Sequence, residues 1–187
     1  GQDDDAATLA QSCREAGIAT SFASDPSRRT TTKVRIVTER NQQVARVDYE
    51  NDGEVAGEVE RRLVASVRQL APEAAVIVVS DYLKGGVSRA LMRAIVDVAA
   101  ERGIPVLVDP KIPHVDYYAG ATLVTPNSHE AETATLLRVR DENSARATAR
   151  AFRDRVGCGA VMITRGDQGM WLLGPDVEGS LSSAARE

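Results

Sequence analysis

Four apolar runs in this sequence each end in carboxylate, amide, hydroxyl or cationic residues. The runs 76–79, 106–108, 123–124 and 161–163 are followed by the polar segments 80–85, 109–111, 125–130 and 164–166. Short β-branched runs separated by helix-length amphipathic segments predict parallel strands joined by crossover helices. The carboxyl ends of such strands share one edge of the sheet, and ligands bind outside that edge. The sequence therefore predicts an active-site rim built from these polar segments.

Asn127 and Glu130 stand where a predicted strand passes through Pro126 into a predicted helix. Asn followed three residues later by Glu is the capping-box pattern, which requires no function. The same arrangement suits a binding site, because a helix N-terminus attracts phosphate and a carboxylate one turn later can hold Mg²⁺ through waters. These residues alone leave both interpretations open.

The other polar segments allow a structural and a chemical interpretation. The segment 109–111 is either an Asp-Pro turn or the position of a lysine that neutralises charge during phosphoryl transfer. The segment 164–166 is either a turn between two strands or a source of hydroxyl and backbone donors beside a nucleotide. The segment 80–85 could simply connect a strand to a helix. His114 and His129 have no partner histidine at metal-ligand spacing, so each is interpreted as a surface or capping residue.

Hydrophobic periodicity predicts the elements that position this rim. Helices are predicted over 4–16, 54–70, 88–102, 128–137 and 144–156, and strands over 76–80, 105–109, 121–125, 160–164 and 169–173. Gly17, Pro72 and Gly103 mark three of the helix ends. Helices alternating with short parallel strands predict a single α/β domain.

Residues 30–51 have a different pattern. Val34, Ile36, Val47 and Tyr49 alternate with charged residues around a turn-like polar segment, which predicts a two-stranded ribbon with one polar face. An isolated two-stranded ribbon is marginally stable in water. We therefore expect the ribbon to pack against a second copy of the chain or against the mouth of the main sheet.

The amino-acid composition limits the kinds of molecule that this chain could bind. The chain has 187 residues, 43% apolar and 27% charged, as is typical of a soluble globular domain. A net charge of -4, a pI near 5.3 and 4% aromatic residues argue against nucleic-acid binding. No apolar stretch approaches the roughly 20 residues needed to cross a bilayer. We expect a cytoplasmic protein without nucleic-acid or membrane partners.

Taken together, the motifs resemble the ribokinase-like (PfkB) carbohydrate kinases, and within them the heptose 7-phosphate kinase branch. The resemblance extends to about Leu173 and rests on the segments 32–35, 40–43, 46–50, 80–85, 108–111, 120–127 with Glu130, and 164–170. The Asn-x-x-Glu element is general to the family. Arg-Asn-Gln-Gln at 40–43 together with Asp-Pro-Lys at 109–111 is more specific to the heptose branch.

The resemblance implies transfer of the ATP γ-phosphoryl group to a sugar hydroxyl, with Mg²⁺, on a three-layer Rossmann-like sheet with the ribbon 30–51 as a lid. In the heptose branch the product is heptose 1,7-bisphosphate, a precursor for lipopolysaccharide. The resemblance implies that the catalytic residues are Lys111, Asn127 and Glu130, with Glu130 as metal ligand. The nucleotide would be contacted by Lys111, Asn127, Thr164, Arg165 and Gly166. The phosphorylated sugar would be contacted by Lys33, Arg35, Asn41, Gln42 and Asp81. Similar kinases often pair through such lids, so a homodimer is expected.

Two elements of the family pattern are missing. The family usually begins with a strand and a Gly-Gly-Asn sugar-binding loop and closes with an Asp-Thr-x-Gly-Ala-Gly-Asp segment that supplies the anion hole and the general base. Neither occurs here, and both Gly1 and the polar tail 179–187 look like cut ends. We therefore expect residues 1–187 to be a partial kinase domain that is inactive alone. A kinase for another sugar or nucleoside, or a dead nucleotide- or sugar-binding module, remains the alternative.

Overall fold

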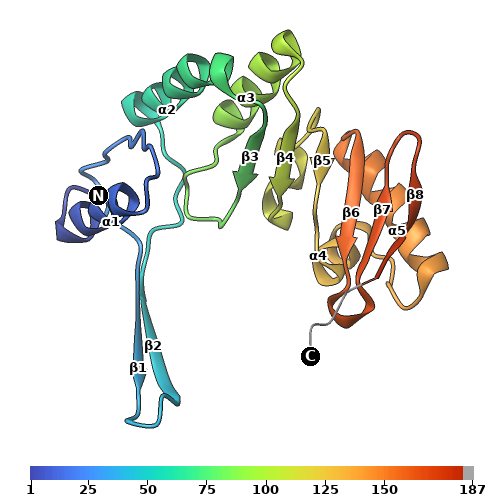
Figure 1. Cartoon of the computed structure of the whole chain (residues 1–187), viewed down its shortest axis with the longest axis horizontal. Coiled ribbons are helices and arrows are strands. Elements are labelled where there is room, and N and C mark those ends of the chain that lie inside the picture. The colour runs from blue at the N-terminus through green and yellow to red at the C-terminus, as the bar shows by residue number, and fades with distance from the viewer. Residues whose placement is uncertain (183–187) are drawn as a thin grey trace.

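The computed structural model describes residues 1–182 and contains a two-stranded ribbon and a six-stranded sheet (Figure 1). The strands are β1 (Thr32–Val37), β2 (Gln43–Tyr49), β3 (Ile77–Ser80), β4 (Val106–Asp109), β5 (Leu123–Val124), β6 (Ala160–Thr164), β7 (Met170–Leu173) and β8 (Glu178–Leu181). The α-helices are α1 (Asp4–Glu15), α2 (Gly57–Leu70), α3 (Arg89–Arg102), α4 (Ser128–Thr135) and α5 (Glu142–Val156), with short 3-10 segments η1 (Ala71–Glu73), η2 (Ile112–Tyr117) and η3 (Gly166–Gln168).

The large sheet follows chain order, β3-β4-β5-β6-β7-β8. Strands β3 to β6 are parallel, as predicted, and β6, β7 and β8 form an antiparallel meander. Crossovers between parallel strands are almost always right-handed, so strands in sequential order place their connecting helices on the same face. Burial alternates accordingly: Val108 and Val124 are buried on one face, whereas Leu107 and Leu123 on the other face are only partly buried.

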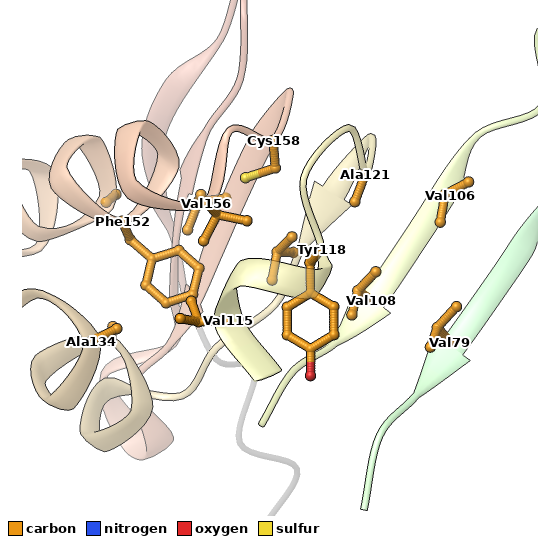
Figure 2. Close-up of a cluster of buried hydrophobic side chains, with 14 of the residues drawn as sticks. Val79, Val106, Val108, Val115, Tyr118, Ala121, Ala134, Phe152, Val156 and Cys158 are labelled. Atoms are coloured by element: carbon orange, nitrogen blue, oxygen red, sulfur yellow. The ribbon is translucent and has the colours of Figure 1, made fainter. Parts of the chain in front are cut away.

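The buried face of the sheet carries one continuous hydrophobic core. Figure 2 shows side chains from β3, β4, η2 and α5 meeting in this cluster, including Val108, Val115, Tyr118 and Phe152. Tyr118 and Phe152 are completely buried. Burial of an aliphatic or aromatic side chain of this kind contributes about 1.5–3 kcal/mol, so the core anchors the η2 segment firmly beneath the strand ends.

Several element boundaries differ from the prediction for identifiable reasons. Helix α5 begins two residues earlier than expected because Asp141 caps it, accepting a hydrogen bond from the Ser144 N–H. Helix α2 begins later than predicted, at Gly57, because Ala56 is extended and Val55 donates its N–H to Gly85 O. Helix α4 ends early, at Thr135, where Leu136 adopts a left-handed conformation.

Strand β8 was not predicted. Residues from Gly179 onward were interpreted as a polar tail, and for 179–181 this is wrong, since β8 pairs with β7 through Trp171 and Ser180. An edge strand can be polar because only one of its faces meets the core. The rest of the expected tail, 183–187, lies outside the described residues.

The ribbon β1–β2 projects away from the main sheet (Figure 1). Its cross-strand pair Val34 and Val47 is 43% and 40% exposed, and Ile36 and Tyr49 are similarly exposed. The ribbon is attached at its base, where Thr32 Oγ1 donates to Asp5 Oδ2 at 2.6 Å. Arg29 lies over the Tyr49 ring, 4.8 Å from its centroid, whereas Val34, Ile36 and Val47 on the same face stay at least 40% exposed among residues 1–182.

None of the helices among residues 1–182 combines the length and hydrophobicity needed to span a bilayer.

Candidate active site

The carboxyl ends of β3, β4, β5 and β6 bring four of the predicted polar segments to one edge of the sheet. Asp81 follows β3, Lys111 follows β4 and Asn127 follows β5. Asn127 forms a parallel bridge with Thr164 at the end of β6, and Ser128 Oγ donates to Thr164 O at 3.3 Å. The rim predicted from the apolar runs is therefore present.

Lys111 and Glu130 form the central ion pair of this rim, with Lys111 Nζ 2.5 Å from Glu130 Oε1. The other carboxylate oxygen accepts the Asn127 N–H at 3.0 Å, and Asn127 Oδ1 accepts the Glu130 N–H at 2.9 Å. The capping box expected from the sequence is thus formed, but only one carboxylate oxygen is needed for it. The second oxygen places a negative charge against the Lys111 ammonium, which comes from the segment after β4, and capping does not require this contact.

The ion pair changes the acid–base behaviour of Lys111. The hydrogen bond to Glu130 raises the pKa of the Lys111 ammonium, partial burial opposes this, and the nearby carboxylates of Glu130, Asp109 and Asp81 add to the rise. The lysine therefore remains cationic at neutral pH.

This pKa shift predicts how the contribution of Lys111 to stability depends on pH. A pKa raised above the ordinary value of 10.5 means that the pair stabilises the fold fully below 10.5 and loses its effect as pH rises through the folded-state pKa. We expect Lys111→Met to melt below the unaltered chain at neutral pH, and the difference to shrink above pH 10.5. Melting curves of both proteins from neutral to alkaline pH measure this; a constant difference would show that the ammonium charge is unimportant.

Asp81 is almost completely buried, at 1% exposure, and its carboxylate is engaged within the chain. Oδ1 accepts the Leu83 N–H at 2.8 Å, while Oδ2 accepts the Tyr118 O–H at 2.8 Å and lies 2.6 Å from His114 Nδ1. The interpretation of His114 as a surface or capping residue is therefore wrong. The sequence carries no signal for this contact, because the two residues come from different elements 33 positions apart.

A polar cluster that sequence reasoning missed continues outward from His114. His114 stacks on Tyr117 with ring centroids 4.4 Å apart. The Arg89 guanidinium also lies over the Tyr117 ring, 4.4 Å from its centroid. Tyr117 Oη donates to Glu54 Oε1 at 2.8 Å. This hydrogen bond raises the pKa of the Tyr117 hydroxyl, with burial adding to it. The cluster presents hydroxyl, imidazole and carboxylate groups beside the rim.

The segment Thr164–Gly166 connects β6 to β7 through the η3 turn, consistent with its interpretation as a turn between strands. The Arg165 side chain is buried, and its guanidinium donates to Gln168 O and to Ser180 Oγ, each at 3.0 Å. Arg165 thus binds the turn to β8. Thr164 remains beside Asn127, and Gly166 has a positive φ of 59°, which favours glycine.

Four of the predicted sugar-binding residues lie on the ribbon, apart from the strand-end rim. Asn41 and Gln42 form the turn between β1 and β2, with Asn41 at φ 57°. Lys33 lies near the base, 3.5 Å from Asp48 and 3.7 Å from Glu50. Arg35 pairs in register with Arg46, so the polar face of the ribbon carries two adjacent cations.

Glu50 connects the ribbon to the rim. Its carboxylate pairs with Lys33 on β1 and also with Lys84 in the loop that follows β3. Gly85 in the same loop has a φ of 74°, and a Cβ there would lie 1.8 Å from Gly53 O. Only glycine allows this close approach of the two backbones. The base of the ribbon is thus held close to the loop that carries Asp81.

Residues at the rim fit a Mg²⁺ ion shared with a substrate. Within residues 1–182, no group of three or more His, Cys, Asp or Glu side chains could enclose a metal by itself. Mg²⁺ usually keeps several waters and is held by one or two carboxylates together with substrate phosphates. Glu130 at the N-terminus of α4 could supply such a carboxylate, and Lys111 could turn to the phosphates.

The pfkB family carbohydrate kinase profile matches residues 1–186. The chain is 40% identical over 149 residues to the bifunctional protein HldE of Geobacter metallireducens and 38% identical over 188 residues to that of Alkalilimnicola ehrlichii. These matches cover 80% and 100% of the chain but 30% and 38% of the relatives, so the chain spans about a third of their length.

The fold is similar to that of solved sugar kinases. A variant of phosphofructokinase-2 from Escherichia coli superposes with a TM-score of 0.74 at 18% identity, over 99% of this chain and 61% of that one. A carbohydrate kinase from Agrobacterium tumefaciens gives a TM-score of 0.67 at 16% identity, over 94% of this chain and 54% of that one.

Proposed function

The chain belongs to the pfkB family of carbohydrate kinases, and we propose that it is part of a kinase that transfers the γ-phosphoryl group of ATP to a heptose 7-phosphate. The observation that carries this proposal is the convergence of the Lys111 ammonium, the Glu130 carboxylate and the N-terminus of α4 at one edge of the sheet. The product would be heptose 1,7-bisphosphate, in cytoplasmic synthesis of a lipopolysaccharide precursor. Similarity to the two HldE proteins supports the choice of sugar.

The rim residues have complementary roles in this proposal. Phosphoryl transfer depends mainly on positioning and on neutralising charge on the transferred oxygens. Lys111 would supply a fixed positive charge, and the free N–H groups and dipole of α4 would favour phosphate at its N-terminus. Asn127 would orient phosphate or water, and Glu130 would hold Mg²⁺, which neutralises phosphate charge when bound. Thr164, Arg165 and Gly166 would border the nucleotide.

The ribbon would supply the sugar contacts. Lys33, Arg35 and the neighbouring Arg46 put cations on one face of the ribbon, as binding of a sugar phosphate requires. Asn41 and Gln42 would contact sugar hydroxyls when the ribbon closes over the rim. Asp81, whose carboxylate is engaged within the chain, would support the inner end of the sugar site without contacting the sugar itself. The ribbon would also pair two copies of the protein through its opposite, apolar face.

The proposed reaction is tested by a substrate panel. The 187 residues contain no Gly-Ala-Gly-Asp segment, the source of the general base in the family resemblance. We expect this chain alone to show no ATP-dependent phosphorylation of heptose 7-phosphate above background, and to bind heptose 7-phosphate at least about tenfold more tightly than fructose 6-phosphate, a difference of about 1.4 kcal/mol. Coupled ADP assays and calorimetry measure the two quantities.

The expected absence of turnover and the expected preference for heptose 7-phosphate can each fail independently. Turnover near 1 s⁻¹, at the low end for kinases, would show that a base is present among these residues. Tighter binding of another sugar or of a nucleoside would assign the site to a different kinase of the family. Absence of both nucleotide and sugar binding would contradict the proposed site.

A further inference from the structure

The hydroxyl of Tyr118 joins two parts of the rim that are otherwise separate. Tyr118 follows η2 directly and is completely buried. Its Oη donates to Asp81 Oδ2 at 2.8 Å and accepts the Lys111 backbone N–H at 3.0 Å. Asp81 after β3 and Lys111 after β4 therefore share one hydroxyl group, which is supplied by a residue outside both strands.

The direction of these hydrogen bonds follows from charge and burial. A hydroxyl has one proton to donate, and the Asp81 carboxylate at 2.8 Å is a better acceptor than the Lys111 carbonyl at 3.3 Å. Burial raises the pKa of the Tyr118 hydroxyl, and the Asp81 carboxylate raises it further, so the proton stays on the tyrosine. The remaining lone pairs of Oη are then free to accept the Lys111 N–H.

Asp81 is itself held in place from two other sides. The Leu83 N–H binds its other oxygen, and His114 Nδ1 contacts the same oxygen as Tyr118. Leu83 has a φ of 53°, an unusual conformation for leucine that this contact helps to hold. A carboxylate with three internal partners and 1% exposure is suited to act as an anchor for its neighbours.

We propose that Tyr118 is a positioning residue for Lys111, whose backbone it couples to the buried Asp81 carboxylate. The backbone N–H of Lys111 is held on one side, and its ammonium reaches Glu130 on the other. A lysine side chain has four rotatable bonds and loses considerable entropy when held in one direction. Because Tyr118 holds the Lys111 backbone in place, fewer side-chain conformations carry the ammonium away from Glu130. The importance of this direction for catalysis rests on the proposed function, but the coupling itself does not.

The test measures the chemical reactivity of Lys111 in the 187-residue chain without nucleotide or sugar. The chain has three lysines, Lys33, Lys84 and Lys111, so mass spectrometry after pulsed acetylation follows each separately. A lysine amine held against a carboxylate is labelled more slowly than one that turns freely into solvent, so the labelling rate of Lys111 reports how firmly it is held against Glu130. We expect Tyr118→Phe to raise Lys111 labelling about threefold or more and to leave Lys33 and Lys84 unchanged.

Two matched variants calibrate this result. Tyr117→Phe removes a neighbouring hydroxyl that binds Glu54, and Lys111 labelling should not change. Glu130→Gln removes the ion-pair partner itself and should raise Lys111 labelling at least as much as Tyr118→Phe does. Unchanged Lys111 labelling in a folded Tyr118→Phe variant would overturn the proposal.

A second measurement uses the unaltered chain and decides the question if Tyr118→Phe does not fold. The Lys111 amide lies outside the strands, and its hydrogen-bond acceptor is the buried Tyr118 hydroxyl. We expect its hydrogen exchange to be slowed as strongly as that of the neighbouring β4 amides. Exchange as fast as in an exposed loop would overturn the coupling. Neither readout depends on phosphoryl transfer, so failure of the proposed function would leave this result unaffected.

Discussion

Glu130→Gln is expected to lower kcat by about two orders of magnitude in any form of this protein that transfers phosphate, because loss of one preorganised charge-stabilising group typically costs that much. The amide retains a hydrogen-bond acceptor for the Asn127 N–H, so the capping box can persist. It cannot hold Mg²⁺ as a carboxylate does, and it leaves Lys111 without its anion. The Mg²⁺ concentration needed for half-maximal rate should rise, as steady-state kinetics over a Mg²⁺ series will show.

A neighbouring carboxylate on the same helix provides the control. Glu132 also lies in α4, but it accepts hydrogen bonds from Arg138 and from the Val139 N–H rather than from the rim. Glu132→Gln should lower the melting temperature and leave kcat and the Mg²⁺ requirement unchanged. If Glu130→Gln behaves in the same way, losing only stability, Glu130 is a capping residue without a catalytic role.

Val34→Asp combined with Val47→Asp is expected to convert a ribbon-mediated dimer to a monomer. The two valines are cross-strand partners, and both are at least 40% exposed on the projecting ribbon. A dimer would bury them together with Ile36 and Tyr49, which provides the partner surface that an isolated ribbon lacks. Burying unpaired carboxylates there would cost about 3 kcal/mol or more, which weakens association by over two orders of magnitude. Sedimentation velocity across a concentration series measures the change.

Val177→Asp is the matched control for the ribbon variants. Val177 is also exposed, at 55%, but lies in the connection between β7 and β8, away from the ribbon. It should leave the association state unchanged. A dimer that survives the two ribbon substitutions would show that another surface pairs the copies, and unchanged sugar affinity would also remove the ribbon from the sugar site.

Local sequence signals predicted most of the elements correctly. The parallel direction of β3 to β6 follows from short β-branched runs separated by amphipathic helices, because period and length are properties of adjacent residues. The capping box at Asn127 was equally readable, since its two hydrogen bonds join residues three positions apart. Errors occurred where a distant contact overrode the local pattern, as at Val55, which pairs with Gly85 instead of starting α2.

The composition of the rim was predictable, but the partners of Asp81 and of the Lys111 backbone were not. Parallel strands must end at a common edge, so Asp81, Lys111, Asn127 and Thr164 could be assigned to one rim from sequence alone. The hydrogen bonds of Asp81 and of the Lys111 backbone depend on η2 and on Tyr118 directly after it, and this irregular backbone has no periodic signal. The contacts of His114 and Tyr118 with the buried Asp81 were therefore not foreseen.

The sequence by itself determined which chemical groups stand at the strand ends, because strand direction and side-chain type are encoded locally. Only the tertiary structure decided which of these groups face one another. The Lys111 ammonium meets Glu130 because β4 and β5 are neighbours and α4 starts beside them. Asp81 is enclosed because the hydrophobic core buries Tyr118, and a buried hydroxyl must find partners, which here are a carboxylate and a backbone N–H.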